Sequence, residues 1–365
     1  MTERIGIPRD RLPRRQLVAA LASAAGLFAF AACSQAAPAA TAIIPSPTAV
    51  PPATPAAAPT PAAAATTAAT PPAVASPPAG SGPPKGSTAA QPTSATVSGT
   101  ADLAVVHGAS PATITRAAVD AIGGIKRFVK PGQTVVVKPN ICTAMAPEYA
   151  ATTNPEVVAT LVTMCREAGA SSIKVLDYPW GSIRTNYRES GIEAAVQQAG
   201  GEMIAITPVK WKKVQIPNAK LLKSVEVFDD VLRADVLINV PIAKNHNLTR
   251  LTLGMKNLMG VVSSREQFHM AMGTYLSDLL QKVKPTFTLM DAVRILTQGG
   301  PGGGNLDWVK KLDTVVASTD ILAVDTYSTS FFGIKPEEIE TITTGARYGL
   351  GTTDLSRLKI FEATK

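Results

Sequence analysis

Side chains that bind anions and exchange protons gather in one stretch of this sequence. An apolar run over residues 236–240 predicts a buried strand, and polar residues lie in it or follow it: Asn239, Lys244, His246, Lys256 and Asn257. Ligands of open α/β sheets bind in the crevice beyond the carboxyl ends of the strands. Lysines and amides stabilise negative charge, and histidine transfers protons. The stretch therefore predicts a site for an anionic ligand or a reacting carbonyl group.

Three further apolar segments also end in polar side chains: Lys138 and Asn140 after residues 134–137, Asp177 after 172–176, and Asp291 after 286–290. Prolines at 139, 179 and 241 are expected to end the strands abruptly and to hold the following loops extended. If the strands run parallel, these polar groups converge on one crevice.

We expect the chemistry from Lys244, His246, Lys256 and Asp177. Lys138, Lys244 and Lys256 would bind and polarise an anionic substrate, the histidine would act as acid or base, and Asp177 or Asp291 would orient the histidine or hold a divalent metal. Ligand binding is expected from a second group: Lys138, Asn140, Asn239, Asn257, Asp291, Gly300 and Gly303. The structural alternative is that these lysines are solvated at loop starts and the aspartates form turns or caps.

The glycine-rich run Gly299-Gly-Pro-Gly-Gly-Gly304 is neither a P-loop nor a dinucleotide fingerprint, because it lacks the GK[ST] ending and does not link a strand to a helix start. It could cradle phosphate through backbone N–H groups, act as a mobile lid, or be a plain flexible loop.

Metal and thiol chemistry remain open in the sequence. His246, His269 and Asp325 are candidate metal ligands, so a divalent metal is an option, but no HxH or HExxH spacing is present. No CxxC spacing exists, and no intrinsic iron–sulfur cluster is expected. Cys142 could be a reactive thiol, although an oxidising compartment disfavours one, and Cys165 lies on the apolar face of a predicted helix. Whether the two cysteines pair is left open.

The first residues predict an export signal over 1–33. Arg14-Arg15 precedes an alanine-rich apolar run over 17–32, and Cys33 closes it. This pattern is typical of a twin-arginine signal with a lipoprotein box. We expect a lipid on Cys33 to anchor the protein outside the cytoplasm, on the outer face of the cytoplasmic membrane or in the periplasm. An uncleaved anchor is the alternative, but the run is short beside the roughly 20 residues of a membrane span.

Residues 34–100 consist almost entirely of Ala, Pro, Thr and Ser, which predicts a disordered linker. Residues 101–365 predict a single domain of α/β class: a mostly parallel sheet with helices on both faces and a small antiparallel insertion at about 210–228. We predict one helix over 113–129 and a capping box over Ser190-Gly-Ile-Glu193. The net charge of the whole chain is +8, but residues 1–33 contribute +3 and Lys85 of the linker +1, which leaves +4 for residues 101–365. This charge is too modest and too scattered to make nucleic acid an expected partner.

Residues 105–361 resemble the bacterial and archaeal family called domain of unknown function 362. The motifs that carry the resemblance include Lys138-Pro-Asn140, Thr153-Asn154-Pro155, Pro241-x-x-Lys244-x-His246, Lys256-Asn257-Leu-Met-Gly260, Gly300-Pro-Gly-Gly303 and Ala317-Ser-x-Asp320-x-x-Ala-x-Asp325. Some family members carry added ferredoxin-like cysteine clusters, which this sequence lacks. The usual Asp-Gly turn is Asp291-Ala292 here. The resemblance implies the fold and the site location, but no settled activity.

Two functions fit these features. One is an exported enzyme that acts on a small anionic substrate, with or without a metal. The other is a tethered lipoprotein that binds an anion without chemistry. A bound metal, a strongly shifted lysine or histidine pKa, or a pocket closed to water would favour the enzyme.

Overall fold

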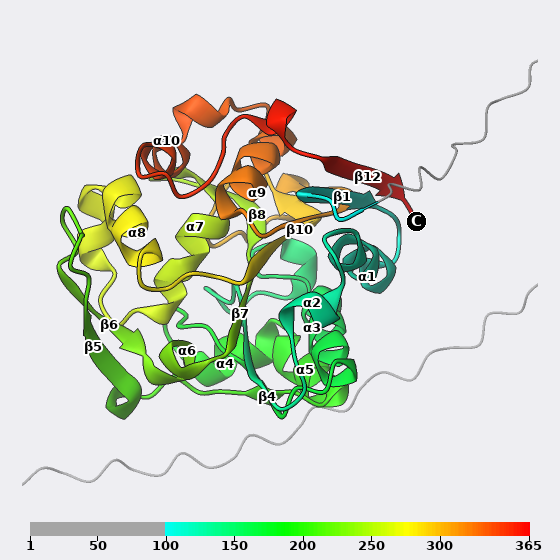
Figure 1. The fold of residues 1–365 in the computed structure, drawn as a ribbon, viewed down its shortest axis with the longest axis horizontal. Helices are drawn as coiled ribbons and strands as arrows, with labels where there is room; N and C mark the ends of the chain where they lie inside the picture. The colour runs from blue at the N-terminus through cyan, green and yellow to red at the C-terminus, as the bar shows by residue number, and fades with distance from the viewer. Residues whose placement is uncertain (1–98) are drawn as a thin grey trace, which may run out of the picture. The chain divides into compact units, whose positions relative to one another are not determined.

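The computed structural model describes residues 99–365, which belong to one compact unit of the chain (Figure 1). The predicted signal over 1–33, the lipidation site Cys33 and nearly all of the predicted linker over 34–100 lie outside the described residues.

A mixed ten-stranded sheet forms the centre of the fold. Its main path runs in the order β12 (Ile360–Thr364), β1 (Leu103–His107), β11 (Val309–Ser318), β10 (Phe287–Leu296), β7 (Val236–Val240), β2 (Thr134–Pro139), β3 (Ser172–Val175) and β4 (Glu202–Met203). Strands β10, β7, β2, β3 and β4 are mutually parallel, whereas β11 is antiparallel to both of its neighbours. Two short strands extend the sheet beside β10: β8 (Ile242–His246) and β9 (Arg250–Thr252). The predicted mostly parallel sheet is confirmed.

Helices cover both faces because successive strand residues point to opposite sides. Val135 and Val137 of β2 pack with α1 (Pro111–Ala121), α3 (Pro155–Glu167) and α5 (Ile192–Ala199). Val136, between them, packs on the other side. Several helices supply that second layer: α6 (Asp229–Arg233), α7 (Gly254–Asn257), α8 (Met272–Leu280), α9 (Ile321–Ser328) and α10 (Glu340–Arg347). Figure 1 shows the sheet between the two sets of helices.

The predicted antiparallel insertion is also confirmed. Strands β5 (Trp211–Gln215) and β6 (Ser224–Phe228) pair in antiparallel register as a separate two-stranded sheet. Lys210 precedes this hairpin, and its ammonium group pairs with Asp230 of α6.

Two local predictions were wrong. The helix expected over 113–129 is broken into α1 and α2 (Ile125–Phe128), because Gly123 and Gly124 both adopt positive φ angles, of 110° and 79°. The capping box expected at Ser190 does not form. Instead α4 (Ile183–Glu189) ends there, and Gly191, at φ 72° in the left-handed region, precedes α5.

Candidate functional site

A pocket opens beyond the carboxyl ends of β2, β3 and β7. Most of the residues predicted to form a site line it: Lys138, Asn140, Asp177, Lys244, His246, Lys256, Asn257 and His269. Its volume is about 60 Å³, so it suits a small ligand. The parallel strands therefore bring together residues that are far apart in sequence, as expected for this class of sheet.

A buried ion pair forms the floor of this pocket. The Lys138 ammonium group at the end of β2 lies 2.7 Å from Oδ1 of Asp177, which follows β3, and both side chains are at most 3% exposed. Burial lowers the pKa of Lys138, and the Asp177 carboxylate opposes that shift. Asp177 also accepts hydrogen bonds from the backbone N–H groups of Ile141 (2.5 Å) and Tyr178 (3.0 Å). Asp177 therefore pairs with Lys138 and forms no hydrogen bond or ion pair with His246, whose orientation it was expected to set.

Gly260 makes room for this pair. A Cβ atom at Gly260 would lie 1.8 Å from Oδ1 of Asp177 and 2.6 Å from Nζ of Lys138. The Gly260 carbonyl also accepts the N–H of Tyr178 at 2.9 Å. Only a residue without a side chain fits where the backbone approaches the pair this closely.

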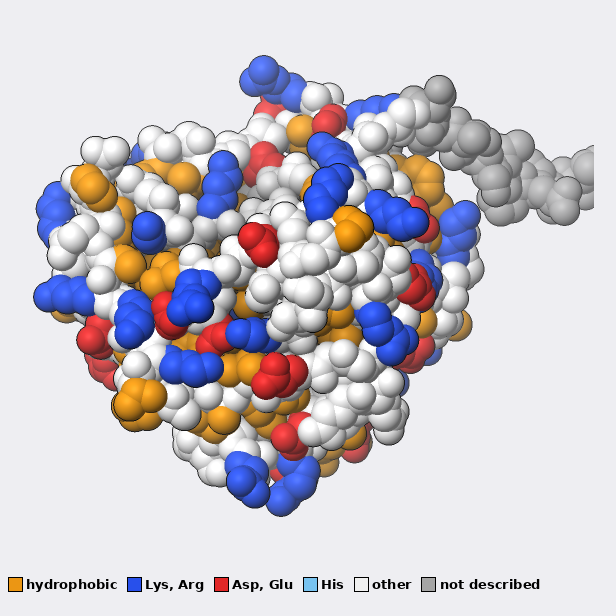
Figure 2. All heavy atoms as spheres, turned by 60° about the horizontal axis from the view of Figure 1, so that its bottom comes forward, with side chains coloured by type: hydrophobic (Ala, Val, Ile, Leu, Met, Phe, Trp, Pro, Cys, Tyr) orange, Lys and Arg blue, Asp and Glu red, His pale blue; other side chains and the backbone are white. Residues whose placement is uncertain are grey.

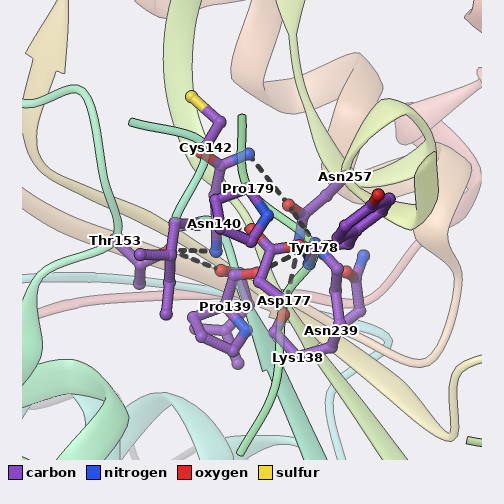
Figure 3. A network of polar contacts seen from close by, with 12 residues as sticks. Lys138, Pro139, Asn140, Cys142, Thr153, Asp177, Tyr178, Pro179, Asn239 and Asn257 are labelled. Atoms are coloured by element: carbon purple, nitrogen blue, oxygen red, sulfur yellow. Dashed lines mark hydrogen bonds and ion pairs between the residues drawn. The ribbon is translucent and has the colours of Figure 1, made fainter. Parts of the chain in front are cut away.

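Three buried asparagines form a network beside Lys138 (Figure 3), and two of them, Asn257 and Asn140, connect it to Lys244. Asn257 Oδ1 accepts from Lys138 Nζ at 2.9 Å and from Asn140 Nδ2 at 3.0 Å. Its Nδ2 donates to Asn239 Oδ1 at 2.9 Å. Asn140 Oδ1 in turn accepts from Lys244 Nζ at 3.0 Å. Because these amides satisfy one another and the lysines, the network fixes the pocket wall, and Asn239 lies behind that wall.

The loop that carries Asn140 is tied to the sheet. Thr153 Oγ1 accepts the Asn140 N–H at 2.8 Å and donates to the Val240 carbonyl at the end of β7, also at 2.8 Å. Next to it, Asn154 caps α3 by accepting the Glu156 N–H at 2.8 Å. The predicted helix start thus also fixes the segment after β2.

Lys244 lies on a strand, although a loop was expected after Pro241. In β8 it is fully buried, and its Nζ contacts three oxygen acceptors: Asn140 Oδ1 at 3.0 Å, Ala151 O at 2.6 Å and Pro301 O at 3.1 Å. The Cys142 sulfur lies 3.0 Å from the same Nζ. Lys244 is thus held by the protein itself.

His246, at the end of β8, is fixed in one tautomer. Its Nδ1 accepts the backbone N–H groups of Leu248 at 3.1 Å and Thr249 at 3.3 Å, so the ring proton of the neutral form sits on Nε2. Burial lowers its pKa to about 3, helped by Lys256, Lys244 and His269. His246 is therefore a neutral hydrogen-bond donor near neutral pH and a poor base.

Lys256 differs from the other pocket lysines. Its ammonium group forms no hydrogen bond or ion pair with any residue from 99 to 365, although it lines the pocket and is largely shielded from water. Burial and, after it, the charge of the nearby Lys244 lower its pKa to about 7. Near neutral pH both protonation states of Lys256 are populated.

Asp325 holds the short helix that carries Lys256. Its Oδ1 accepts the Gly254 N–H at 2.6 Å, and its Oδ2 accepts the Met255 N–H at 2.9 Å. These are the first N–H groups of α7, which have no partner within the helix. Burial raises the pKa of Asp325 to about 7. Asp325 is therefore attached to α7 and does not line the pocket with His246 and His269.

Some predicted ligand-binding residues lie outside the pocket lining. Asp291 accepts the N–H groups of Asn154 at 2.7 Å and Val293 at 2.9 Å, and burial raises its pKa to about 6. Gly300 packs against the backbone of Asn245, and Gly303 packs against Ala151. The glycine-rich run supplies only Pro301 to the pocket. Within residues 99–365, no group of three or more His, Cys, Asp or Glu side chains is placed to hold a metal ion.

Several lining residues were not predicted: Tyr178, Trp180, Thr252, Arg265 and Pro301. The guanidinium group of Arg265 lies 4.6 Å from the ring centroid of Tyr178 and donates to the Tyr178 carbonyl at 2.7 Å. The aromatic residues directly follow Asp177, so their position after a strand end was a usable signal. Arg265 precedes a short 3-10 helix far along the chain, and nothing in its local sequence indicates a site.

The comparisons with known proteins assign the chain to a family. A family described as "Domain of unknown function (DUF362)" matches residues 135–330, more than half of the chain, and the chain belongs to that family. This confirms the resemblance found in the sequence.

Two known proteins are similar to the chain. The thylakoid-associated protein sll1697 of Synechocystis sp. is 28% identical over 247 residues, which cover 65% of this chain and 75% of the relative. The lactate racemase apoprotein from Thermoanaerobacterium thermosaccharolyticum aligns with a TM-score of 0.42 and 12% identity over 64% of this chain, which spans 57% of that structure.

No helix within the described part of the chain is long and apolar enough to cross a membrane.

Proposed function

We propose that this protein is an enzyme that binds a small anionic substrate in the pocket and exchanges a proton with it through Lys256. The observation that carries the proposal is the contrast among the pocket lysines. Lys138 is paired with Asp177, and Lys244 is surrounded by acceptors, whereas Lys256 has no partner among residues 99–365. A shielded cation without a partner is costly to the fold, and an incoming anion would compensate for it.

The charges of the lining support an anionic ligand. Lys256 and Arg265 face the pocket, and the single carboxylate among its lining residues, Asp177, is neutralised by Lys138. Elsewhere the charges are mixed: on the face drawn in Figure 2, basic side chains are interspersed with acidic ones. Local attraction of an anion would therefore come from the pocket and not from a broad basic surface.

The protonation states support proton transfer. A pKa of about 7 lets Lys256 accept or donate a proton near neutral pH, which is the condition for efficient general acid–base catalysis. His246 keeps a proton on Nε2 and can donate a hydrogen bond to a substrate oxygen as its negative charge grows. Lys138, Asn140, Asn239 and Asn257 would hold the walls in place.

A binding and turnover screen tests this function. Inorganic phosphate and a panel of small carboxylates and 2-oxo acids would be titrated into the full chain by calorimetry, and each bound compound would then be incubated with the protein and followed by NMR. We expect at least one anion to bind and to be converted. Lys256→Met should abolish conversion, whereas Lys126→Met, at an exposed lysine in α2, should leave it unchanged.

The same screen distinguishes an enzyme from a protein that only binds its ligand. An anion that binds tightly and is recovered unchanged would identify a non-catalytic binding lipoprotein. Failure of every anion to bind would overturn the proposal.

We also propose that the protein acts outside the cytoplasm, tethered to the membrane through a lipid on Cys33. The signal pattern over 1–33 supports this location, and one relative is named a thylakoid-associated protein. The predicted linker over 34–100 would let the domain work at a distance from the bilayer.

A further inference from the structure

The buried Lys244 ammonium group has an unusual set of neighbours. The oxygens around it belong to one amide and two backbone carbonyls, and within residues 99–365 it forms no ion pair with a carboxylate. A fully buried cation normally requires an anionic partner, because neutral dipoles alone do not offset the loss of water.

The one acidic group in contact with Lys244 is the Cys142 thiol. Its sulfur lies 3.0 Å from Nζ, closer than the 3.7 Å and 3.9 Å that separate it from the carbonyl oxygens of Pro301 and Ala151. A thiolate at this position would supply the missing counter-ion. Cys142 is also partly exposed and lines the pocket, so small molecules can reach it.

A further feature of the pocket suits a ligand near this sulfur. Thr252, which lines the same pocket and is only 3% exposed, has a hydroxyl without a hydrogen-bond partner in residues 99–365. A buried hydroxyl of this kind is expected to bond to something that enters the pocket.

Cys165 provides an internal contrast. It is fully buried in the apolar core on α3, and burial raises its pKa to about 12. Thiolates react as nucleophiles whereas thiols do not, so Cys165 should be inert. The described domain thus holds one thiol beside a buried cation and one in an apolar core.

We propose that Cys142 is the nucleophile of this pocket and that the substrate is a small anion with an electrophilic carbonyl carbon, an inference that rests on the proposed function. The Cys142 thiolate attacks that carbon, an S–C bond forms, and the C=O π pair moves to the oxygen. The Lys256 ammonium group gives a proton to this oxygen and becomes neutral. The anionic part of the substrate then lies among the pocket cations. No oxidant or reductant is needed.

Alkylation of the reduced full-length protein tests the reactivity. Iodoacetate and iodoacetamide would be compared near neutral pH, with labelling resolved by peptide mass spectrometry and free glutathione as reference. In either reaction the sulfur displaces iodide from carbon. We expect Cys142 to be labelled and Cys165 to stay free. The ratio of iodoacetate to iodoacetamide rates at Cys142 should exceed that of glutathione by about tenfold, because cationic clefts concentrate anions.

Lysine variants show which residue makes Cys142 reactive and which one makes it prefer iodoacetate. Lys244→Met should slow the reaction of Cys142 with both reagents. Lys256→Met should reduce only the preference for iodoacetate. Lys126→Met should change neither the reaction rates nor this preference. Because loss of Lys244 could unfold the chain, Cys142→Ser is the second variant. It should still bind the anion found by calorimetry, but it should lose conversion.

The outcomes separate this inference from the proposed function. If an anion binds and is converted while Cys142 reacts no faster than glutathione with either reagent, the nucleophile is wrong and the enzyme proposal stands. If Cys142→Ser retains full conversion, the inference is likewise overturned. If Cys142 shows the preferred reaction with iodoacetate but no substrate anion binds, the reactive thiol is supported and the proposed function fails.

Discussion

Replacement of Gly260 by alanine should break the buried ion pair on the floor of the pocket. The added Cβ would lie 1.8 Å from Asp177 Oδ1 and 2.6 Å from Lys138 Nζ, whereas a Cβ atom essentially never comes within 3.0 Å of a heavy atom to which it is not linked along the chain. Asp177 cannot retreat freely, because the N–H groups of Ile141 and Tyr178 hold its two oxygens. The pair must separate, or the backbone that carries these groups must move.

The size of the effect follows from the burial of the pair. Both side chains are at most 3% exposed, so separation leaves two charges without water. Breaking a buried pair by removal of one partner costs about 3–5 kcal/mol. We expect Gly260→Ala to lower the free energy of unfolding by about the same amount. For a domain of this size, that shifts the melting temperature by on the order of 10 °C.

Urea unfolding of the full chain measures this change, with Gly302→Ala as the matched control. A Cβ at Gly302 meets nothing within 4 Å, and that residue does not adopt a positive φ. The control should lie within about 0.5 kcal/mol of the parent. In a Lys138→Met, Asp177→Ala background, Gly260→Ala should cost distinctly less, because no pair remains to be broken. Equal stability of Gly260→Ala and Gly302→Ala would refute the reasoning.

Three more predictions follow from single residues. The ring signals of His246 should not titrate between about pH 5 and about pH 8 by NMR, because its pKa is about 3; a midpoint in that window would contradict its assigned state. Burial raises the pKa of Asp325 from 3.8 to about 7, so the folded protein retains a proton that the unfolded chain releases, and stability falls as pH rises through this interval. In Asp325→Asn, the free energy of unfolding measured with urea should fall less across the same pH interval. An equal fall in variant and parent would argue against a proton held by Asp325 in the folded state. Cys33→Ala should move the full chain from the membrane to the soluble fraction of its host, and retention in the membrane would point to an uncleaved anchor.

The strand ends were predictable because they depend on local pattern. Apolar runs followed by proline and polar residues marked the ends of β2, β3 and β7, and parallel pairing then placed Lys138, Asp177 and Lys244 around one pocket. The same pattern placed Asp291 just after a strand end, but its strand continues to Leu296. The Asp291 carboxylate accepts backbone N–H groups and does not line the pocket.

The roles of the residues could not be predicted, because each depends on a partner distant in sequence. Asp177 was expected to serve His246 or a metal and instead neutralises Lys138. His246 was expected to act as acid or base, but backbone N–H groups fix its Nδ1 as an acceptor. Lys256 was one lysine among several in the sequence, and only the tertiary contacts show that it alone among the pocket lysines lacks a partner in residues 99–365.

The titration of Lys256 tests the central claim most directly. Protein labelled with carbon-13 at lysine Cε would be followed by NMR across pH, and Lys256→Met would assign its signal. We predict one lysine with a midpoint near 7, against the ordinary 10.5, which disappears in the variant and moves upward when a small anion is bound. If the signal that disappears in Lys256→Met keeps a midpoint near 10.5 and ignores anions, Lys256 is an ordinary solvated cation and the proposed function is wrong.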